Sequence, residues 1–200
     1  MLLKFSILFF FIFGSHQKIY GQNSIIGISP SKLKKVNGLM FNVYPMEHSD
    51  STSFPTINGI ELGVCPLTIF FPFLIAIHSI DPDFHQPLLD NIKFQNHKKI
   101  NGIQVSFLNM EPTLINGIDI NASGSFESKV NGLTCSMIIN KHHKMNGLTI
   151  GIMGNHDTEC NGVQVGLFNS SKKLRGFQFG LWNKNEKRSL PFINWYFGKK

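Results

Sequence analysis

The chain has 200 residues, a formal net charge of +7 and 16% charged residues. That length suits one domain, or one repeat array with a cap. The low charge and the 18 glycines argue against helical bundles and coiled coils, and the 12% of aromatic residues argues against a disordered chain. The basic residues lie in predicted loops without a stripe of aromatic residues between them, so we do not expect nucleic acid as a partner.

Residues 1–21 have the features of a signal peptide. Lys4 gives a basic start, and the apolar run Phe5–Phe13 is too short to span a bilayer. Gly21 offers a small residue for cleavage before Gln22. We therefore expect an exported protein, at the cell surface, in the outer envelope or secreted, without a transmembrane helix after cleavage.

The next segments differ in character. Residues 22–35 form a polar leader, and residues 36–64 hold two repeats marked by Asn37-Gly38 and Asn58-Gly59. Residues 65–99 interrupt the repeat, and we predict a non-repeat insertion there.

Residues 100–184 carry six tandem repeats. Asn-Gly recurs every 15 residues from Asn101 to Asn161, and Arg175-Gly176 follows after 14. An apolar residue precedes each pair, and apolar residues stand one, three and five positions after each glycine. Between them are polar or small residues. This alternation predicts one short strand per repeat, with the glycine supplying a positive-φ corner.

The fold class that follows is all-β. We expect the apolar side chains of stacked copies to share one interior. Two arrangements remain open: a parallel β-solenoid with one coil per repeat, or an antiparallel β-meander or barrel. The solenoid is favoured because every copy is alike, and in-register stacking lets asparagines such as Asn109, Asn169 and Asn183 form ladders. Residues 185–200 then form a C-terminal cap.

The template and the tail carry a family resemblance. The segments Arg175–Asn183, reading RGFQFGLWN, and Arg188–Trp195, reading RSLPFINW, together with the repeat resemble bacterial surface repeat-containing proteins of the Leptospira type, with relatives in Bacteroidetes. The resemblance covers roughly residues 36–197. It implies a cell-envelope or secreted protein of unknown activity and supplies no catalytic residue.

The sequence offers few candidate site residues. If the apolar face is inward, a row of polar residues points outward and could recognise a protein or a glycan at the cell surface: Gln104, Thr134, Thr149, Gln164 and Gln178. We expect no catalytic, cofactor or metal site, because no acid/base pair and no metal-ligand spacing is found.

Histidines and cysteines also have simple interpretations. His142, His143 and His156, with Asp157, fall in equivalent positions of adjacent copies and are expected to be solvated loop residues. The odd total of three cysteines is not typical of a disulfide framework. Cys135 and Cys160 occupy apolar positions and are expected to be small core residues.

These features predict a non-catalytic repeat protein of the cell envelope, or a secreted one, with a structural or interaction role. The alternative is a small outer-membrane β-barrel, for which the three outward apolar positions give a thin lipid-facing band of ~13 Å.

Overall fold

The computed structural model describes residues 23–29, 33–43, 55–64, 98–109 and 113–198. The predicted signal peptide lies outside these residues, as does the predicted insertion apart from Lys98 and Lys99. The described residues contain no helix that is long and apolar enough to cross a membrane.

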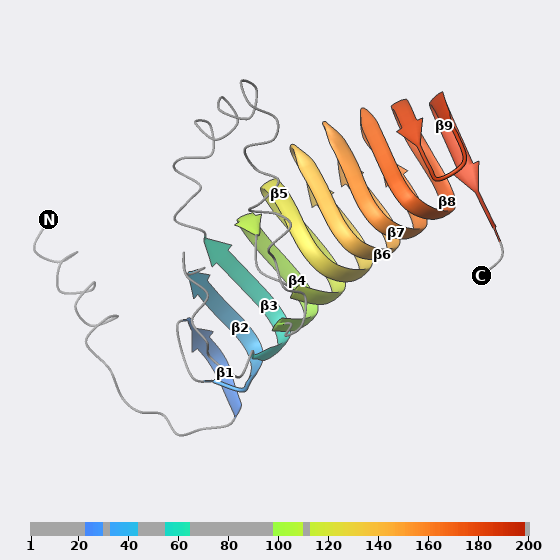
Figure 1. Cartoon of the computed structure of the whole chain (residues 1–200). Coiled ribbons are helices and arrows are strands. Elements are labelled where there is room, and N and C mark those ends of the chain that lie inside the picture. The colour runs from blue at the N-terminus through green and yellow to red at the C-terminus, as the bar shows by residue number, and fades with distance from the viewer. Residues whose placement is uncertain (1–22, 30–32, 44–54, 65–97, 110–112, 199–200) are drawn as a thin grey trace, which may run out of the picture.

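Nine strands form one sheet in chain order (Figure 1). They are β1 (Asn23–Ile28), β2 (Lys35–Val43), β3 (Thr56–Val64), β4 (Lys98–Asn109), β5 (Thr113–Ser136), β6 (Ile139–Gly151), β7 (Gly154–Val165), β8 (Phe168–Lys184) and β9 (Ser189–Tyr196). β1 lies within the segment predicted as a polar leader.

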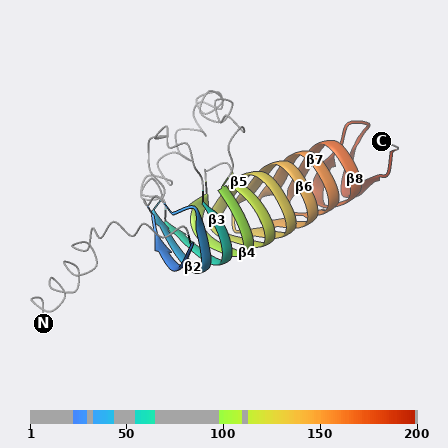
Figure 2. The ribbon, with the colours of Figure 1, turned by 90° about the horizontal axis from the view of Figure 1, so that it is seen from below.

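The strands from β1 to β8 pair in parallel and in register. Asn58 pairs with Asn101, Asn101 with Asn116, and Asn146 with Asn161. The long strands bend around the coil, so the chain winds as a row of stacked turns (Figures 1 and 2). The parallel pairing confirms the predicted β-solenoid over the antiparallel alternatives.

The Asn-Gly corners hold adjacent coils together. Every glycine of these corners has φ between 138° and 152°, a region that favours glycine. Each asparagine donates its Nδ2–H to Oδ1 of the asparagine in the preceding coil, from Asn58 to Asn161, at 2.7–2.8 Å. The expected asparagine ladders therefore exist, and one of them runs along this corner.

A second ladder lies inside the coil. Asn140 donates to Asn155 at 2.9 Å, Asn155 to Asn169 at 2.8 Å, and Asn169 to Asn183 at 2.8 Å. All four of these amides also bond a strand carbonyl, such as Asn155 to Val165 O at 2.8 Å. This ladder includes Asn169 and Asn183, as predicted, whereas Asn109 bonds the Glu127 carboxylate instead.

The C-terminal cap is confirmed. β9 pairs with β8 in antiparallel orientation and ends the parallel stack. Asn194 is buried and donates to Gln178 Oε1 at 3.1 Å and to Asn183 O at 3.2 Å. Arg188 lies over the Trp195 ring at 4.5 Å. The cap thus satisfies polar groups that the last coil would otherwise expose.

The prediction that all apolar positions face inward is wrong. The apolar core is Met40 together with one column, the residue before each Asn-Gly or Arg-Gly: Val36, Ile57, Ile100, Ile115, Val130, Met145, Cys160 and Leu174. The apolar residues after each glycine point outward. Apart from Met40, the inward strand positions between them are polar or glycine, and stacking satisfies many of the polar hydrogen bonds. The alternation of apolar and polar residues shows that each strand has two different faces, but it does not show which face is inside the coil.

Candidate functional site

The outer surface of the strands after each glycine is apolar, and we call it the apolar face. At most of its positions at least a third of the side chain is exposed. Nearest the corner it has Leu39, Ile60, Ile103, Ile118, Leu133, Leu148, Val163 and Phe177. The middle row has Phe41, Leu62, Val105, Ile120, Cys135, Ile150, Val165 and Phe179. The third row has Val43, Val64, Phe107, Ala122, Met137, Ile152, Leu167 and Leu181. No charged or amide side chain interrupts these rows.

The apolar face continues onto both terminal strands. On β1, Ile26 pairs with Leu39 and Ile28 with Phe41. On β9, Trp195 pairs with Phe177 and Ile193 with Phe179. Phe197 also packs edge-on against Phe177, with ring centroids 5.2 Å apart.

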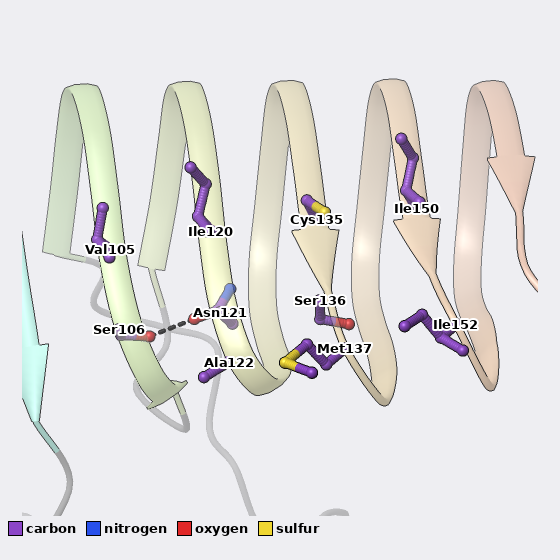
Figure 3. Close-up of a pocket in the computed structure, with 10 residues that line it drawn as sticks. All are labelled: Val105, Ser106, Ile120, Asn121, Ala122, Cys135, Ser136, Met137, Ile150 and Ile152. Carbon is purple, nitrogen blue, oxygen red and sulfur yellow. Dashed lines mark hydrogen bonds between the residues drawn. The ribbon is translucent and has the colours of Figure 1, made fainter.

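A shallow hollow of about 290 Å³ lies within the apolar face. It forms where Ala122 stands in a row that elsewhere carries larger side chains. Figure 3 shows two of the rows around it, with Val105, Ile120, Cys135 and Ile150 in one, and Ala122, Met137 and Ile152 in the other. Ser106 and Asn121 are hydrogen-bonded to each other at its floor. The hollow is therefore part of the apolar face and not a separate polar site.

A row of lysines runs beside the apolar face, beyond the corner asparagines. The lysine row consists of Lys35, Lys99, Lys129, Lys144 and Lys173, each two residues before its Asn or Arg. In-register pairing keeps them in line, as for Lys129 with Lys144. Glu159 falls in the same row and bonds Lys144 at 3.2 Å and Lys173 at 2.8 Å, which lowers the pKa of its carboxyl. One edge of the apolar face is thus basic.

No family model, curated protein or solved structure matches this chain.

The predicted polar interaction face is wrong in its orientation. All five of its residues are 0% exposed and lie inside the solenoid: Gln104, Thr134, Thr149, Gln164 and Gln178. A partner outside the coil cannot contact them. Their register is as predicted, since Thr134 pairs with Thr149, Thr149 with Gln164 and Gln164 with Gln178.

The histidines and cysteines divide between inside and outside. His143 and His156 are exposed as expected, but His142 and Asp157 are buried and bonded, with Nδ1 and Oδ1 2.7 Å apart. Cys160 is in the core as predicted, and burial raises the pKa of its thiol. Cys135 is partly exposed on the apolar face, contrary to expectation. Over the described ranges, no three His, Cys, Asp or Glu side chains are grouped to hold a metal.

The C-terminal half of the interior is a connected polar chain. Asn194 donates to Gln178, Gln178 to Gln164 Oε1 at 2.6 Å, and Gln164 to Asp157 Oδ2 at 2.8 Å. Asp157 in turn bonds His142. A buried polar group is stable only when it is hydrogen-bonded, and glutamine is long enough to cross the coil and reach its partner.

The N-terminal half of the interior contains buried charges that sequence reasoning missed. Lys98 and Glu61 form a buried ion pair of 2.6 Å. Asp119 and Glu127 are buried as well. The alignment of the repeats could have indicated their burial, because Glu61 and Asp119 occupy the same position of the repeat as the buried Gln104.

Proposed function

We propose that this protein is a non-catalytic envelope or secreted solenoid that binds the surface of a lipid bilayer through its apolar face. The observation that carries the proposal is the uninterrupted apolar character of the outward positions on one layer of the solenoid, from β1 to β9. Soluble monomers rarely expose a contiguous apolar patch of more than a few hundred Å².

The size of the apolar face suits a membrane surface. Strands ~4.8 Å apart give nine of them a length of ~38 Å, and four residue steps of ~3.3 Å give a width of ~13 Å. Covering this footprint of ~500 Å² would contribute at most ~12 kcal/mol at ~25 cal/mol per Å². The cost of immobilising the protein at the membrane reduces that gain.

Charge supports a lipid surface over a second copy of the chain. Lysines beside an apolar face can extend their ammonium groups to anionic headgroups while their carbon stems stay near the apolar surface. The formal net charge of +7 falls to +5 when the predicted signal peptide with Lys4 and Lys18 is removed (7 − 2), and this positive charge attracts an anionic surface and repels another copy. The exposed tryptophans Trp182 and Trp195, near the cap, suit the same water–lipid boundary.

The proposal of export rests on the basic and apolar residues at the start of the sequence. The proposal that the protein is not an enzyme rests on the outer face itself, since apolar side chains offer neither a nucleophile with a base nor an acid/base pair. A glycan partner fits less well, because the amide row that could have bound sugars is inside the coil.

Co-sedimentation with vesicles of anionic and zwitterionic lipid tests the proposal. Val165 and Phe179 are paired neighbours on the apolar face, and we expect the double variant Val165→Lys/Phe179→Lys to lose most vesicle binding, because two charges would enter the apolar layer. The matched control is His156→Lys/Ser170→Lys, which places the same charges on the same two coils but on the opposite layer. The control should bind like the native chain.

Two results would contradict lipid attachment. One is equal vesicle binding by both double variants. The other is a native chain that ignores vesicles but forms a dimer in sedimentation velocity that Val165→Lys/Phe179→Lys dissociates. That second result would assign the apolar face to a second copy.

A further inference from the structure

The interior of the solenoid changes character where the inward side chains become short. Gln164 reaches across the coil to Asp157, seven residues earlier. In the equivalent register positions of the two preceding coils, Thr149 faces His142 and Thr134 faces Glu127. A threonine is too short to make the bond that glutamine makes.

Unpartnered polar atoms gather at this place. Among the described residues, several fully buried atoms have no hydrogen-bond partner: Asp119 Oδ1, Glu127 Oε2, Ser128 Oγ, Thr134 Oγ1 and His142 Nε2. The corner ladder aligns Asn116 with Asn131, so Asp119 and Thr134, three residues further on, stack in one column. Glu127 faces that column from the opposite layer.

The two carboxylates are close to each other. The Ser125 hydroxyl lies 2.8 Å from Asp119 Oδ2 and 3.5 Å from Glu127 Oε1. Asn121 donates to Asp119 Oδ2 at 2.7 Å, and Asn109 donates to Glu127 Oε1. Each carboxylate therefore has one oxygen held by the chain and one oxygen, Asp119 Oδ1 or Glu127 Oε2, left for a ligand.

The nearby basic side chains are shared with other carboxylates. Lys98 bonds Glu61 at 2.6 Å, and His142 bonds Asp157 at 2.7 Å. Lys98 also attracts Asp119 and Glu127, but one ammonium beside three buried carboxylates leaves negative charge uncompensated, and a positive ligand removes that cost. Burial raises the pKa of Asp119 to about 6, and burial together with the charge of Asp119 raises the pKa of Glu127.

We propose that Asp119 and Glu127 bind a hard divalent cation of the calcium class inside the solenoid, with the Thr134 hydroxyl as a further oxygen ligand. Calcium takes about six to eight oxygen ligands in flexible geometry, so water would complete the shell that these three oxygens begin, whereas magnesium demands near-ideal octahedral geometry. The cation enters while the coils form. This site is independent of the apolar face and of membrane binding.

Calcium binding to the full chain tests the proposal. After treatment with EDTA and its removal, equilibrium dialysis against calcium should give one tightly held ion per chain, and calcium should raise the melting temperature. Asp119→Asn/Glu127→Gln should lose both effects. Without calcium this variant should melt at or above the native chain, because it no longer buries two carboxylates whose charge Lys98 offsets only in part.

Glu159→Gln is the matched control, since it removes a partly exposed carboxylate that already has two lysine partners. It should bind calcium like the native chain. A native chain that takes up no calcium at millimolar concentration overturns the proposal and leaves the carboxyl groups neutralised by protons. Calcium retained by Asp119→Asn/Glu127→Gln also overturns it, because the ion would then lie elsewhere.

Discussion

Individual residues explain why this solenoid has polar side chains inside and apolar ones outside. In a parallel in-register stack, each amide meets its own copy one coil away, so Asn155 and Gln164 can be buried without losing hydrogen bonds. The period-two pattern of Ile118, Asp119 and Ile120 predicts alternation correctly. Hydrophobicity then suggests the wrong face as the inner one. A hydrophobicity scale for single residues does not include the hydrogen-bond partners that adjacent coils supply after stacking.

Asp119 should make stability depend on pH when calcium is removed. Its carboxyl has a pKa of about 6 in the folded state against an ordinary value of 3.8, so the folded chain binds more protons between these values. The free energy of unfolding therefore falls as pH rises through this window, by up to ~3 kcal/mol for this group. Denaturant unfolding in EDTA at pH 4.5 and pH 7 measures the difference, which Asp119→Asn should reduce.

The Asp119→Asn comparison is needed because other carboxylates titrate in the same range. Glu127 should leave a residual slope of the same sign, since its pKa is raised as well. The assignment would be contradicted if the free energy of unfolding rose from pH 4.5 to pH 7, and rose equally in the native chain and in Asp119→Asn.

At the scale of the coil, the sequence predicted the repeat length, the glycine corner and the cap. These features have local signals: Asn-Gly every 15 residues and an aromatic tail after the last copy. It did not predict β1 as part of the stack, because Asn23–Ile28 lacks an Asn-Gly corner and joins the sheet only through pairing with β2. The cation site was also missed, since Asp119 and Glu127 have no metal-binding spacing and meet only by coil geometry.

Gly132→Ala should damage the contact between two coils. Gly132 has φ of 144°, and an added Cβ would collide with the carbonyl oxygen of Gly117 in the preceding coil. We expect a loss of at least ~3 kcal/mol in the free energy of unfolding, from strain and from separation of the coils. Urea denaturation followed by far-UV circular dichroism measures it.

Gly124→Ala is the control for this prediction. Gly124 has ordinary backbone dihedrals, and its nearest contact to an added Cβ is Ile139 O at 3.1 Å. Its cost should be ~1 kcal/mol, as for a moderate packing change. Equal costs at both positions would mean that the corner does not set the spacing of the coils.

The whole molecule is an amphipathic slab, with an apolar outer layer, a polar interior and a basic edge. The architecture could be predicted from the sequence because every repeat contains an Asn-Gly or Arg-Gly pair and the same alternation of apolar and polar residues. The sequence could not predict the amphipathic character, which depends on the direction in which each strand faces. Because these strands face outward with their apolar side chains, the three rows of the apolar face form a surface instead of a core.

Reversing charge along the lysine row should weaken vesicle binding only at low salt. In Lys35→Glu/Lys99→Glu/Lys129→Glu the attraction to anionic headgroups becomes repulsion, and screening removes most of it above ~0.5 M salt. We expect about a tenfold or greater loss of affinity at low ionic strength and near-native binding at high ionic strength. Vesicle co-sedimentation across a salt series measures both.

The apolar face behaves differently in the same series. Val165→Lys/Phe179→Lys should bind weakly at every salt concentration, because salt does not restore buried apolar contact. A lysine-row variant that loses binding equally at all salt concentrations would show that these lysines act on the fold and not on headgroups.

Each repeat begins and ends at equivalent positions of the coil. Met145 and Cys160, for example, both precede an Asn-Gly and both belong to the core column. A gene segment of one repeat length can therefore be duplicated in frame with its core, corner and outward residues in their usual environments. Each duplication would lengthen the slab by ~4.8 Å and add three more outward apolar side chains. A change in the number of repeats can thus enlarge or reduce the area of the apolar face in small equal steps, while the kind of side chain on that face stays the same.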